Sequence, residues 1–170
     1  MKTKKKGFTL IELIISLSIL TIVLGLIYSV FLSSQKNINK VEAKSDLQQE
    51  AQQILQYINQ GGMEAEKVAV TSEGLKNTII FTTDKRQDGS VKEYKFILDN
   101  NTNELRYSSS KAENKLLGKY VKNIRVNTII QGETLENCSA LKINIYLSKK
   151  GTNNENYDYE VITNVYFRNK

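Results

Sequence analysis

The chain has 170 residues, a mass of 19.4 kDa and a formal net charge of +6, and it contains no His, no Trp, no Pro and a single Cys. This length is sufficient for one domain of ordinary size and an additional helix. The composition excludes a His-based acid–base site, a Cys/His metal cluster and an internal disulfide. We therefore expect no cofactor and no metal site, and the chain is not predicted to be an enzyme.

The positive charge is concentrated at the start of the chain. Lys2, Lys4, Lys5 and Lys6 lie within the first six residues, and without them 20 Lys and Arg face 18 Asp and Glu, a balance of +2. The remaining basic residues are interleaved with acidic ones, whereas nucleic-acid binding needs a dense basic stripe. No nucleic-acid partner is expected for the folded body.

A long apolar segment follows the lysines. Leu13 to Gln35 contains no charged residue, and a helix from Phe8 to Leu32 would be roughly 37 Å long, enough to cross a hydrocarbon core of about 30 Å. The segment is longer than the apolar core of a secretory signal, and no small-x-small cleavage pattern follows it. By the positive-inside rule the N-terminus is cytoplasmic and the bulk of the chain extracytoplasmic.

Glu12 interrupts the apolar block between Ile11 and Leu13. A charged side chain within a membrane-spanning helix is costly and usually has a specific partner. One interpretation is a carboxylate close to the helix end that reaches the lipid headgroups. The residues before Glu12 favour a different interpretation of this charge.

The segment Lys4-Lys5-Lys6-Gly7-Phe8-Thr9-Leu10-Ile11-Glu12 resembles the processing site of type IV prepilins and type II secretion pseudopilins. The resemblance implies that a prepilin peptidase cleaves between Gly7 and Phe8 and methylates the new amine of Phe8. It also implies that Glu12 offsets the N-terminal amine of a neighbouring subunit during assembly. Opposite charges attract strongly in a low-dielectric filament core, and either alone is costly there. Gly7, which lacks a Cβ, allows a protease to approach the backbone closely.

The helical pattern continues beyond the membrane segment. Apolar residues at helical spacing define one face, and Gly61-Gly62 is predicted to end the helix; the face comprises Val41, Leu47, Ala51, Ile54, Leu55 and Ile58. A helix from Phe8 to Gln60 would be about 80 Å long, like the spine of a pilin. Gly25 is the only obvious residue in this helix at which the helix is expected to be less stable. Many major pilins have a kinking proline here, and major pilins and many minor ones have a C-terminal disulfide, which Cys138 alone cannot form. The lack of both favours a minor pilin or a pseudopilin.

After Gly62 the pattern changes to period-two alternation. Strands are predicted at Thr78–Thr83, Val91–Leu98, Leu141–Leu147 and Tyr157–Phe167. Hairpin loops are predicted at Asp84–Ser90, Asp99–Asn103 and Lys149–Asn156. Leu116–Ile130 fits either a short helix or a strand. The predicted fold class is α+β: a long N-terminal helix packed on a mainly antiparallel β-sheet head. The expected organisation is a leader (1–7), a transmembrane or filament-core helix (8–32), an amphipathic continuation (33–60) and a globular head (61–170).

The sequence contains three further patterns that are weaker indicators of function. The ending Val165-Tyr166-Phe167-Arg168-Asn169 resembles the closing strand of minor pilins of the PilW type and of GspJ-type pseudopilins, which lie near filament tips. Ser108-x-x-Lys111 and Ser139-x-x-Lys142 match an acylating-hydrolase pattern but lack its companion motifs. Asp99–Glu104 alternates oxygen ligands like a calcium loop, yet it lacks the turn glycine and the final Glu, so a hairpin turn is expected.

The sequence thus predicts a structural subunit, a minor pilin or pseudopilin, of a type IV pilus, type II secretion or competence filament. Its expected partners are a prepilin peptidase, other pilin or pseudopilin subunits, an assembly-platform membrane protein and lipid of the cytoplasmic membrane. The expected localisation is the cytoplasmic membrane and then a filament. Two rival hypotheses are a membrane-anchored extracellular binding module that uses the N-terminus only as an anchor, and a secreted hydrolase with an uncleaved signal anchor.

Overall fold

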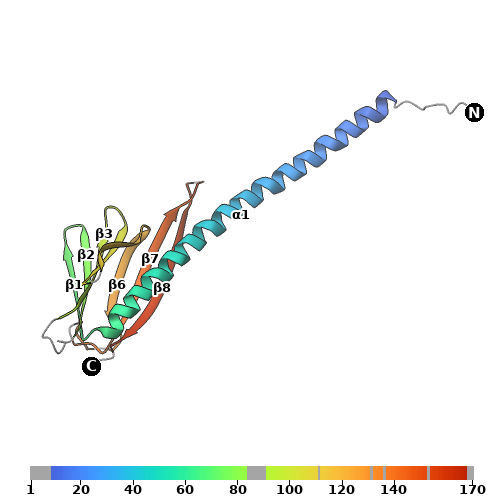
Figure 1. The fold of residues 1–170 in the computed structure, drawn as a ribbon. Helices are drawn as coiled ribbons and strands as arrows, with labels where there is room; N and C mark the ends of the chain where they lie inside the picture. Colours follow the sequence, from blue (N-terminus) through green and yellow to red (C-terminus); the bar gives the residue numbers. More distant parts are fainter. Residues whose placement is uncertain are drawn as a thin grey trace, which may run out of the picture. The chain divides into compact units, whose positions relative to one another are not determined.

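The computed structural model describes residues 9–83, 91–110, 112–130, 132–135, 137–152 and 154–167. The chain divides into two compact units, Met1–Val41 and Glu42–Lys170. Within these residues one helix, α1 (Leu10–Glu64), contributes to both units, and eight strands follow it in the second unit (Figure 1). The predicted α+β class, with a long N-terminal helix and antiparallel sheets, is confirmed.

The strands form two antiparallel meanders, in which each strand pairs with the next one along the chain. The five-stranded sheet contains β1 (Lys67–Glu73), β2 (Lys76–Thr82), β3 (Glu93–Asp99), β4 (Glu104–Ser109) and β5 (Ala112–Gly118). The three-stranded sheet contains β6 (Val121–Thr128), β7 (Ala140–Lys150) and β8 (Asn156–Tyr166). Hairpins therefore make up the whole described sheet structure.

Alternation places one face of each sheet in the core. In β3 the buried side chains are Tyr94, Phe96 and Leu98. In β7 they include Leu141, Ile143, Ile145 and Leu147, on one face as predicted, and Ala140 at the start of the strand is buried as well. Each such side chain stabilises the fold by about 1.5–3 kcal/mol relative to exposure. Edge-to-face packing of Phe81 on Phe96, with ring centroids 5.7 Å apart, adds specificity.

Within the second unit, α1 packs one of its faces against this core. The buried residues recur every three or four positions: Ala43, Leu47, Ala51, Ile54 and Ile58. The prediction that Val41 shares this face was wrong, since its side chain is 67% exposed. Six residues of helix separate Val41 from Leu47, which turns its side chain roughly 120° away from the buried face.

The prediction that Gly61-Gly62 ends the helix was also wrong, because α1 continues to Glu64. The two glycines instead lie where the helix approaches the sheets. A Cβ on Gly62 would lie 2.0 Å from Cγ1 of Val165 in β8, and a Cβ on Gly61 would lie 3.4 Å from Tyr94 in β3. Gly62 is therefore required by close packing rather than by a turn.

The remaining predictions for the head are partly confirmed. The ambiguous segment Leu116–Ile130 contains the end of β5 and all of β6, and no helix. Asp99–Asn103 is a hairpin turn, as predicted, and Asp99 Oδ1 accepts the Asn101 N–H at 2.9 Å. The loop predicted at Lys149–Asn156 is shorter, because β7 reaches Lys150 and β8 begins at Asn156. Strands β1 and β4 were not predicted, and the predicted loop Asp84–Ser90 lies outside the described residues.

Candidate processing and assembly site

The first described residues form a reciprocal cap at the start of α1. The backbone N–H of Thr9 donates to Glu12 Oε2 at 2.9 Å, and the N–H of Glu12 donates back to Thr9 Oγ1 at 3.3 Å. The Thr9 hydroxyl also donates to Glu12 Oε2 at 3.0 Å. This is a capping box, which satisfies backbone donors that a helix N-terminus otherwise leaves free.

The cap gives Thr9 and Glu12 a role that the sequence analysis did not assign. The signal was present, because Thr-x-x-Glu before an apolar run is the sequence pattern of a capping box. Gly7 and Phe8, the predicted cleavage and methylation residues, lie outside the described residues. Within the single chain the Glu12 carboxylate bonds to its own helix start, so the predicted pairing with a neighbouring subunit's amine remains a prediction.

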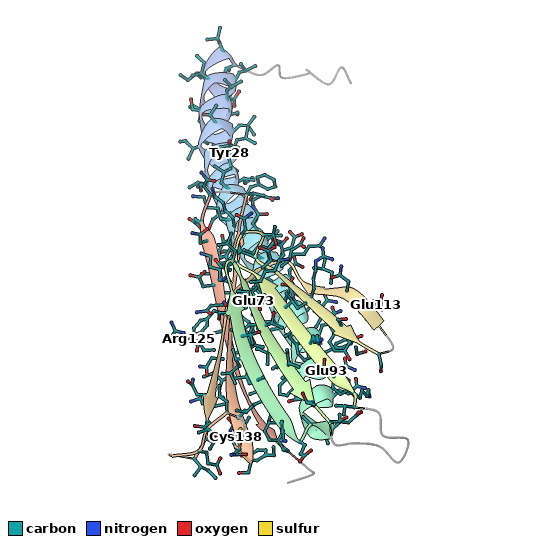
Figure 2. All side chains as sticks on the ribbon, turned by 90° about the vertical axis from the view of Figure 1, so that its left-hand side faces the viewer. Tyr28, Glu73, Glu93, Glu113, Arg125 and Cys138 are labelled. Carbon is teal, nitrogen blue, oxygen red and sulfur yellow. The ribbon has the colours of Figure 1, made fainter. Side chains whose placement is uncertain are left out.

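The apolar part of α1 carries its side chains on the surface of the chain. The exposed fraction is 78% for Leu10, 63% for Tyr28 and 68% for Val30, and the side chains project outward around Tyr28 (Figure 2). This is the one helix among the described residues that is long and apolar enough to cross a membrane. So much apolar surface needs a covering of lipid or of other apolar helices.

Four hydroxyl side chains in this segment donate hydrogen bonds to carbonyl groups of the same helix. The hydroxyl of Ser16 donates to the Glu12 carbonyl at 2.7 Å, and that of Ser18 to the Ile14 carbonyl at 2.8 Å. Thr21 and Ser29 bond in the same way to carbonyls three residues earlier. Because hydrocarbon offers no hydrogen-bonding partners, this internal pairing suits the segment to a bilayer or a filament core.

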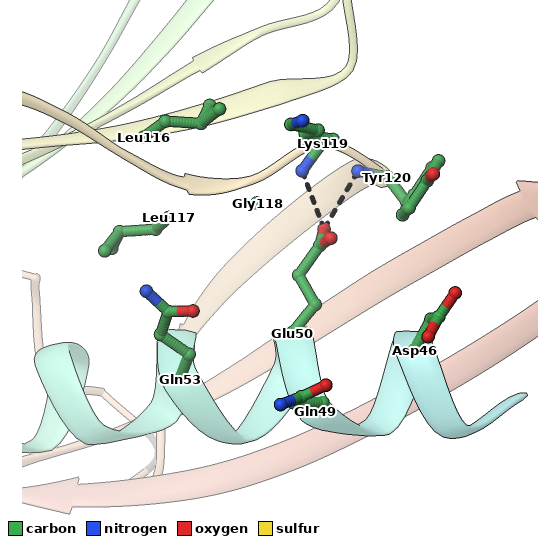
Figure 3. Close-up of a pocket in the computed structure, with 9 residues that line it drawn as sticks. All are labelled: Asp46, Gln49, Glu50, Gln53, Leu116, Leu117, Gly118, Lys119 and Tyr120. Atoms are coloured by element: carbon green, nitrogen blue, oxygen red, sulfur yellow. Dashed lines mark hydrogen bonds between the residues drawn. The ribbon is translucent and has the colours of Figure 1, made fainter. Parts of the chain in front are cut away.

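A second feature connects α1 to the head through Glu50. Its Oε1 accepts the backbone N–H groups of Lys119 at 2.8 Å and Tyr120 at 2.9 Å, in the short connection between β5 and β6 (Figure 3). Glu50 lines a groove of about 390 Å³ with Asp46, Gln49, Gln53 and residues 116–120. Burial raises the pKa of Glu50, although the two backbone hydrogen bonds oppose that shift.

Further polar contacts hold the helix to the strands at other levels. Lys92 Nζ lies 2.7 Å from Glu64 Oε2, and Tyr94 contacts both side chains. Burial lowers the pKa of Lys92, but hydrogen bonds to Glu64 and Tyr94 raise it more, so the net direction is upward. Lys149 pairs with Asp46. The helix is thus fixed to the head by carboxylates as well as by its apolar face.

The weaker motifs acquire no catalytic geometry. Ser139 precedes β7 and bonds to Glu133, whereas Lys142 is exposed on the outer face of β7. Lys111 lies outside the described residues. Among the described residues, no group of three or more His, Cys, Asp or Glu side chains is placed to hold a metal ion. The carboxylate of Asp99 accepts turn N–H groups, as expected for a hairpin.

Comparison with known proteins bears on the N-terminal segment. Residues 2–28 match the family model of the prokaryotic N-terminal methylation motif. No curated protein and no solved structure matches the chain. The match covers Gly7, Phe8 and Glu12 and extends into the apolar part of α1 as far as Tyr28.

The chain therefore carries a prepilin-type methylation motif, continued by a membrane-compatible helix and an antiparallel-sheet head. The motif and the architecture support the type IV pilin and pseudopilin family, as the sequence predicted. Processing by a prepilin peptidase, membrane anchoring and assembly with other pilin subunits follow from the motif. The PilW or GspJ branch remains a prediction.

Proposed function

We propose that this chain is a minor pilin or pseudopilin of a type IV pilus, type II secretion or competence filament. It is cleaved between Gly7 and Phe8, methylated on Phe8, and added to the filament through α1 by an assembly-platform membrane protein. The observation that carries the proposal is the methylation motif, continued by an apolar helical segment whose side chains are exposed. The absence of Pro and the single Cys support a minor rather than a major subunit.

In this proposal residues 1–7 are the leader, 8–32 the part of the helix held in the membrane or filament core, and 33–60 its amphipathic continuation. The N-terminus is cytoplasmic and the head extracytoplasmic. The role of the Glu12 carboxylate is to neutralise the N-terminal amine of a neighbour in the apolar core. The chain acts as a structural subunit, without catalysis of its own.

The first test is intact-mass analysis of the full chain produced with and without a prepilin peptidase. We expect loss of residues 1–7 and gain of one methyl group only when the peptidase is present. Gly7→Ala should block the cleavage, whereas Gly25→Ala should not, because an added Cβ at Gly25 meets no atom within 4 Å. An uncut chain, or a cut beyond the apolar segment, would contradict the proposal and favour the anchored binding module.

The second test separates assembly from helix capping at Glu12. Glu12→Ala removes the carboxylate and the two hydrogen bonds that it accepts from Thr9, whereas Thr9→Val removes the capping hydroxyl and keeps the carboxylate. We expect Glu12→Ala chains to be cleaved but absent from sheared filaments, and Thr9→Val chains to be incorporated. If Glu12→Ala chains enter filaments at the wild-type level, Glu12 has no assembly role. A binding module that needs only an anchor predicts that result.

A further inference from the structure

The two sheets leave four edge strands, β1, β5, β6 and β8, within the described part of the chain. An edge strand presents unpaired backbone N–H and C=O groups that can pair with another strand. Proteins usually prevent this with short edge strands, charged side chains (Lys above all), prolines or bulges. The four edges differ in whether they carry such features.

Three edges are protected in the usual ways. Strand β1 is seven residues long and begins with Lys67. Strand β5 contains Lys115 and pairs with β4 through two register irregularities. Strand β6 contains Lys122 and Arg125 and pairs with β7 through one irregularity. Each of these edges is a poor template for a second chain.

Strand β8 is not short and has no Lys, proline or bulge; its charged residues are the acidic Asp158 and Glu160. It has eleven residues, Asn156–Tyr166, and contains no Lys, Arg, Pro or Gly. Its register with β7 is unbroken over all eleven positions. Among the described residues no strand pairs with its other side. β8 is therefore a long, regular edge whose charges are acidic only, and it is the least protected of the four edges.

The hydrogen-bond pattern identifies the groups that this edge offers. The Phe167 N–H donates to the Ser139 carbonyl at 3.1 Å, which continues the ladder between β7 and β8. Since bonded and non-bonded pairs alternate in an antiparallel ladder, even-numbered residues of β8 point their backbone groups away from β7. Their side chains lie on the exposed face of the sheet; they are Asn156, Asp158, Glu160, Ile162, Asn164 and Tyr166.

The side chains of this edge divide into an acidic half and an apolar half. Asp158 and Glu160 are exposed, and neither takes part in a salt bridge within the described part of the chain. Further along the strand, Ile162 is 51% and Tyr166 is 64% exposed. A complementary strand would place Lys or Arg near the two carboxylates and apolar side chains near Ile162 and Tyr166.

We propose that β8 is a docking edge for an extended strand from the head of a neighbouring pilin-like subunit. This inference rests on the proposed function, because the filament supplies the neighbour. Helices that bundle in the filament core bring the heads together at high effective concentration, so even a weak strand contact is populated. The joined strands extend the three-stranded sheet into the next head, and the charge pattern selects a basic partner strand.

The test is site-specific photo-crosslinking in cells that assemble the filament, with the full chain. A benzophenone side chain replaces Asn164 in one variant and Asn127 in the other. Both residues lie in one row across the exposed face, with Lys142 between them, but Asn164 is on β8 and Asn127 on β6. We expect an adduct from position 164, joined to the head of a subunit with a prepilin-type motif by peptide mass spectrometry. Position 127 should give little or none.

A second pair of variants tests the backbone contact. Ile162→Pro removes an N–H that points away from β7, so pairing with β7 is preserved, whereas Ile162→Thr keeps the N–H. We expect Ile162→Pro to reduce the adduct at position 164 about fivefold or more relative to Ile162→Thr, as loss of one hydrogen bond implies. Protease resistance of the head controls for folding.

The proposal is overturned if position 164 gives no adduct, or if positions 127 and 164 give equal adducts. It is also overturned if the proline variant, folded, crosslinks as well as the threonine variant. Cleavage after Gly7 and recovery in sheared filaments are scored on the same samples. Normal cleavage and recovery without the adduct refute only the β8 contact, whereas an uncut chain refutes the proposed function.

Discussion

Replacement of Glu50 should reveal how strongly the helix is fixed to the head. The backbone nitrogens of Lys119 and Tyr120 lie 2.8 and 2.9 Å from Glu50 Oε1. In Glu50→Ala both N–H groups lose this acceptor. Hydrogen bonds to a charged group contribute roughly 1.5–3 kcal/mol each when buried, and half-burial of Glu50 reduces this, so we expect a total loss of about 2 kcal/mol. Glu50→Gln keeps an acceptor oxygen and loses the buried charge, and should remain within about 1 kcal/mol of the wild type.

The sign of the pH dependence follows from burial. The pKa of Glu50 is raised in the folded head, so the folded state binds a proton more readily than the unfolded chain. This group's contribution to the free energy of unfolding is therefore greatest at acidic pH and falls as pH rises through the folded-state pKa. Glu50→Gln lacks this dependence, so the stability difference, wild type minus Gln variant, should increase as pH falls toward the ordinary Glu range.

The assay can use the chain's single cysteine. Cys138 is fully buried, so its alkylation in increasing urea reports opening of the head in the detergent-solubilised full chain. Tyrosine fluorescence gives a second probe, because the chain has nine Tyr and no Trp. If Gln and Ala variants lose equal stability at pH 7, the acceptor role of Glu50 is refuted. A difference between wild type and Gln that is constant with pH would refute the effect of burial.

Two further predictions concern the end of α1. Gly62→Ala should destabilise the head by about 1–3 kcal/mol through overpacking against Val165, whereas Gly61→Ala, whose Cβ would make ordinary contacts, should cost less than about 1 kcal/mol. Urea unfolding checks both, and Val165→Ala should recover part of the Gly62→Ala loss; purely additive effects would contradict the contact. Lys92→Met should cost about 1 kcal/mol or less at pH 7, because Glu64 is partly exposed. The raised pKa of Lys92 means that its stabilisation is present below the ordinary Lys range and lost as pH rises through the folded value, so wild type and variant should converge in alkaline urea titrations.

Much of the fold was predictable because the core strands alternate clearly. Strands β3 and β7 place aromatic and aliphatic residues at every second position and were recognised for that reason. Strand β1 was missed because six of its seven residues are exposed, so burial imposes no alternation on the sequence. Strand β4 has six residues, of which only Leu105 and Tyr107 are buried, so its alternation is too short to stand out in the sequence. Gly61-Gly62 was misread because a glycine needed for close packing and one needed for a helix end look alike in sequence.

The candidate site was predictable only where its signals are local. The methylation motif occupies consecutive residues, and the Thr9–Glu12 cap spans three positions, so both can be found by inspection of a short segment. The role of Glu50 could not be found that way, because its partners are 69 and 70 residues further along the chain. The β8 edge could not be found in the sequence either. A strand is an edge when no strand pairs with its second side, and the pairing within the described residues is known only from the three-dimensional structure.

The hairpin connectivity of the head has a consequence for the order of folding. Every strand pairs with its sequence neighbour, so both sheets can form from contacts of short range, which favours rapid folding. The contacts between α1 and the sheets close far longer loops, such as the 103 residues between Asp46 and Lys149. The entropy of loop closure rises with that separation, so docking of the helix is expected to be the late step. A chain that emerges from a translocation channel would then complete its sheets first, and α1 would dock on them last.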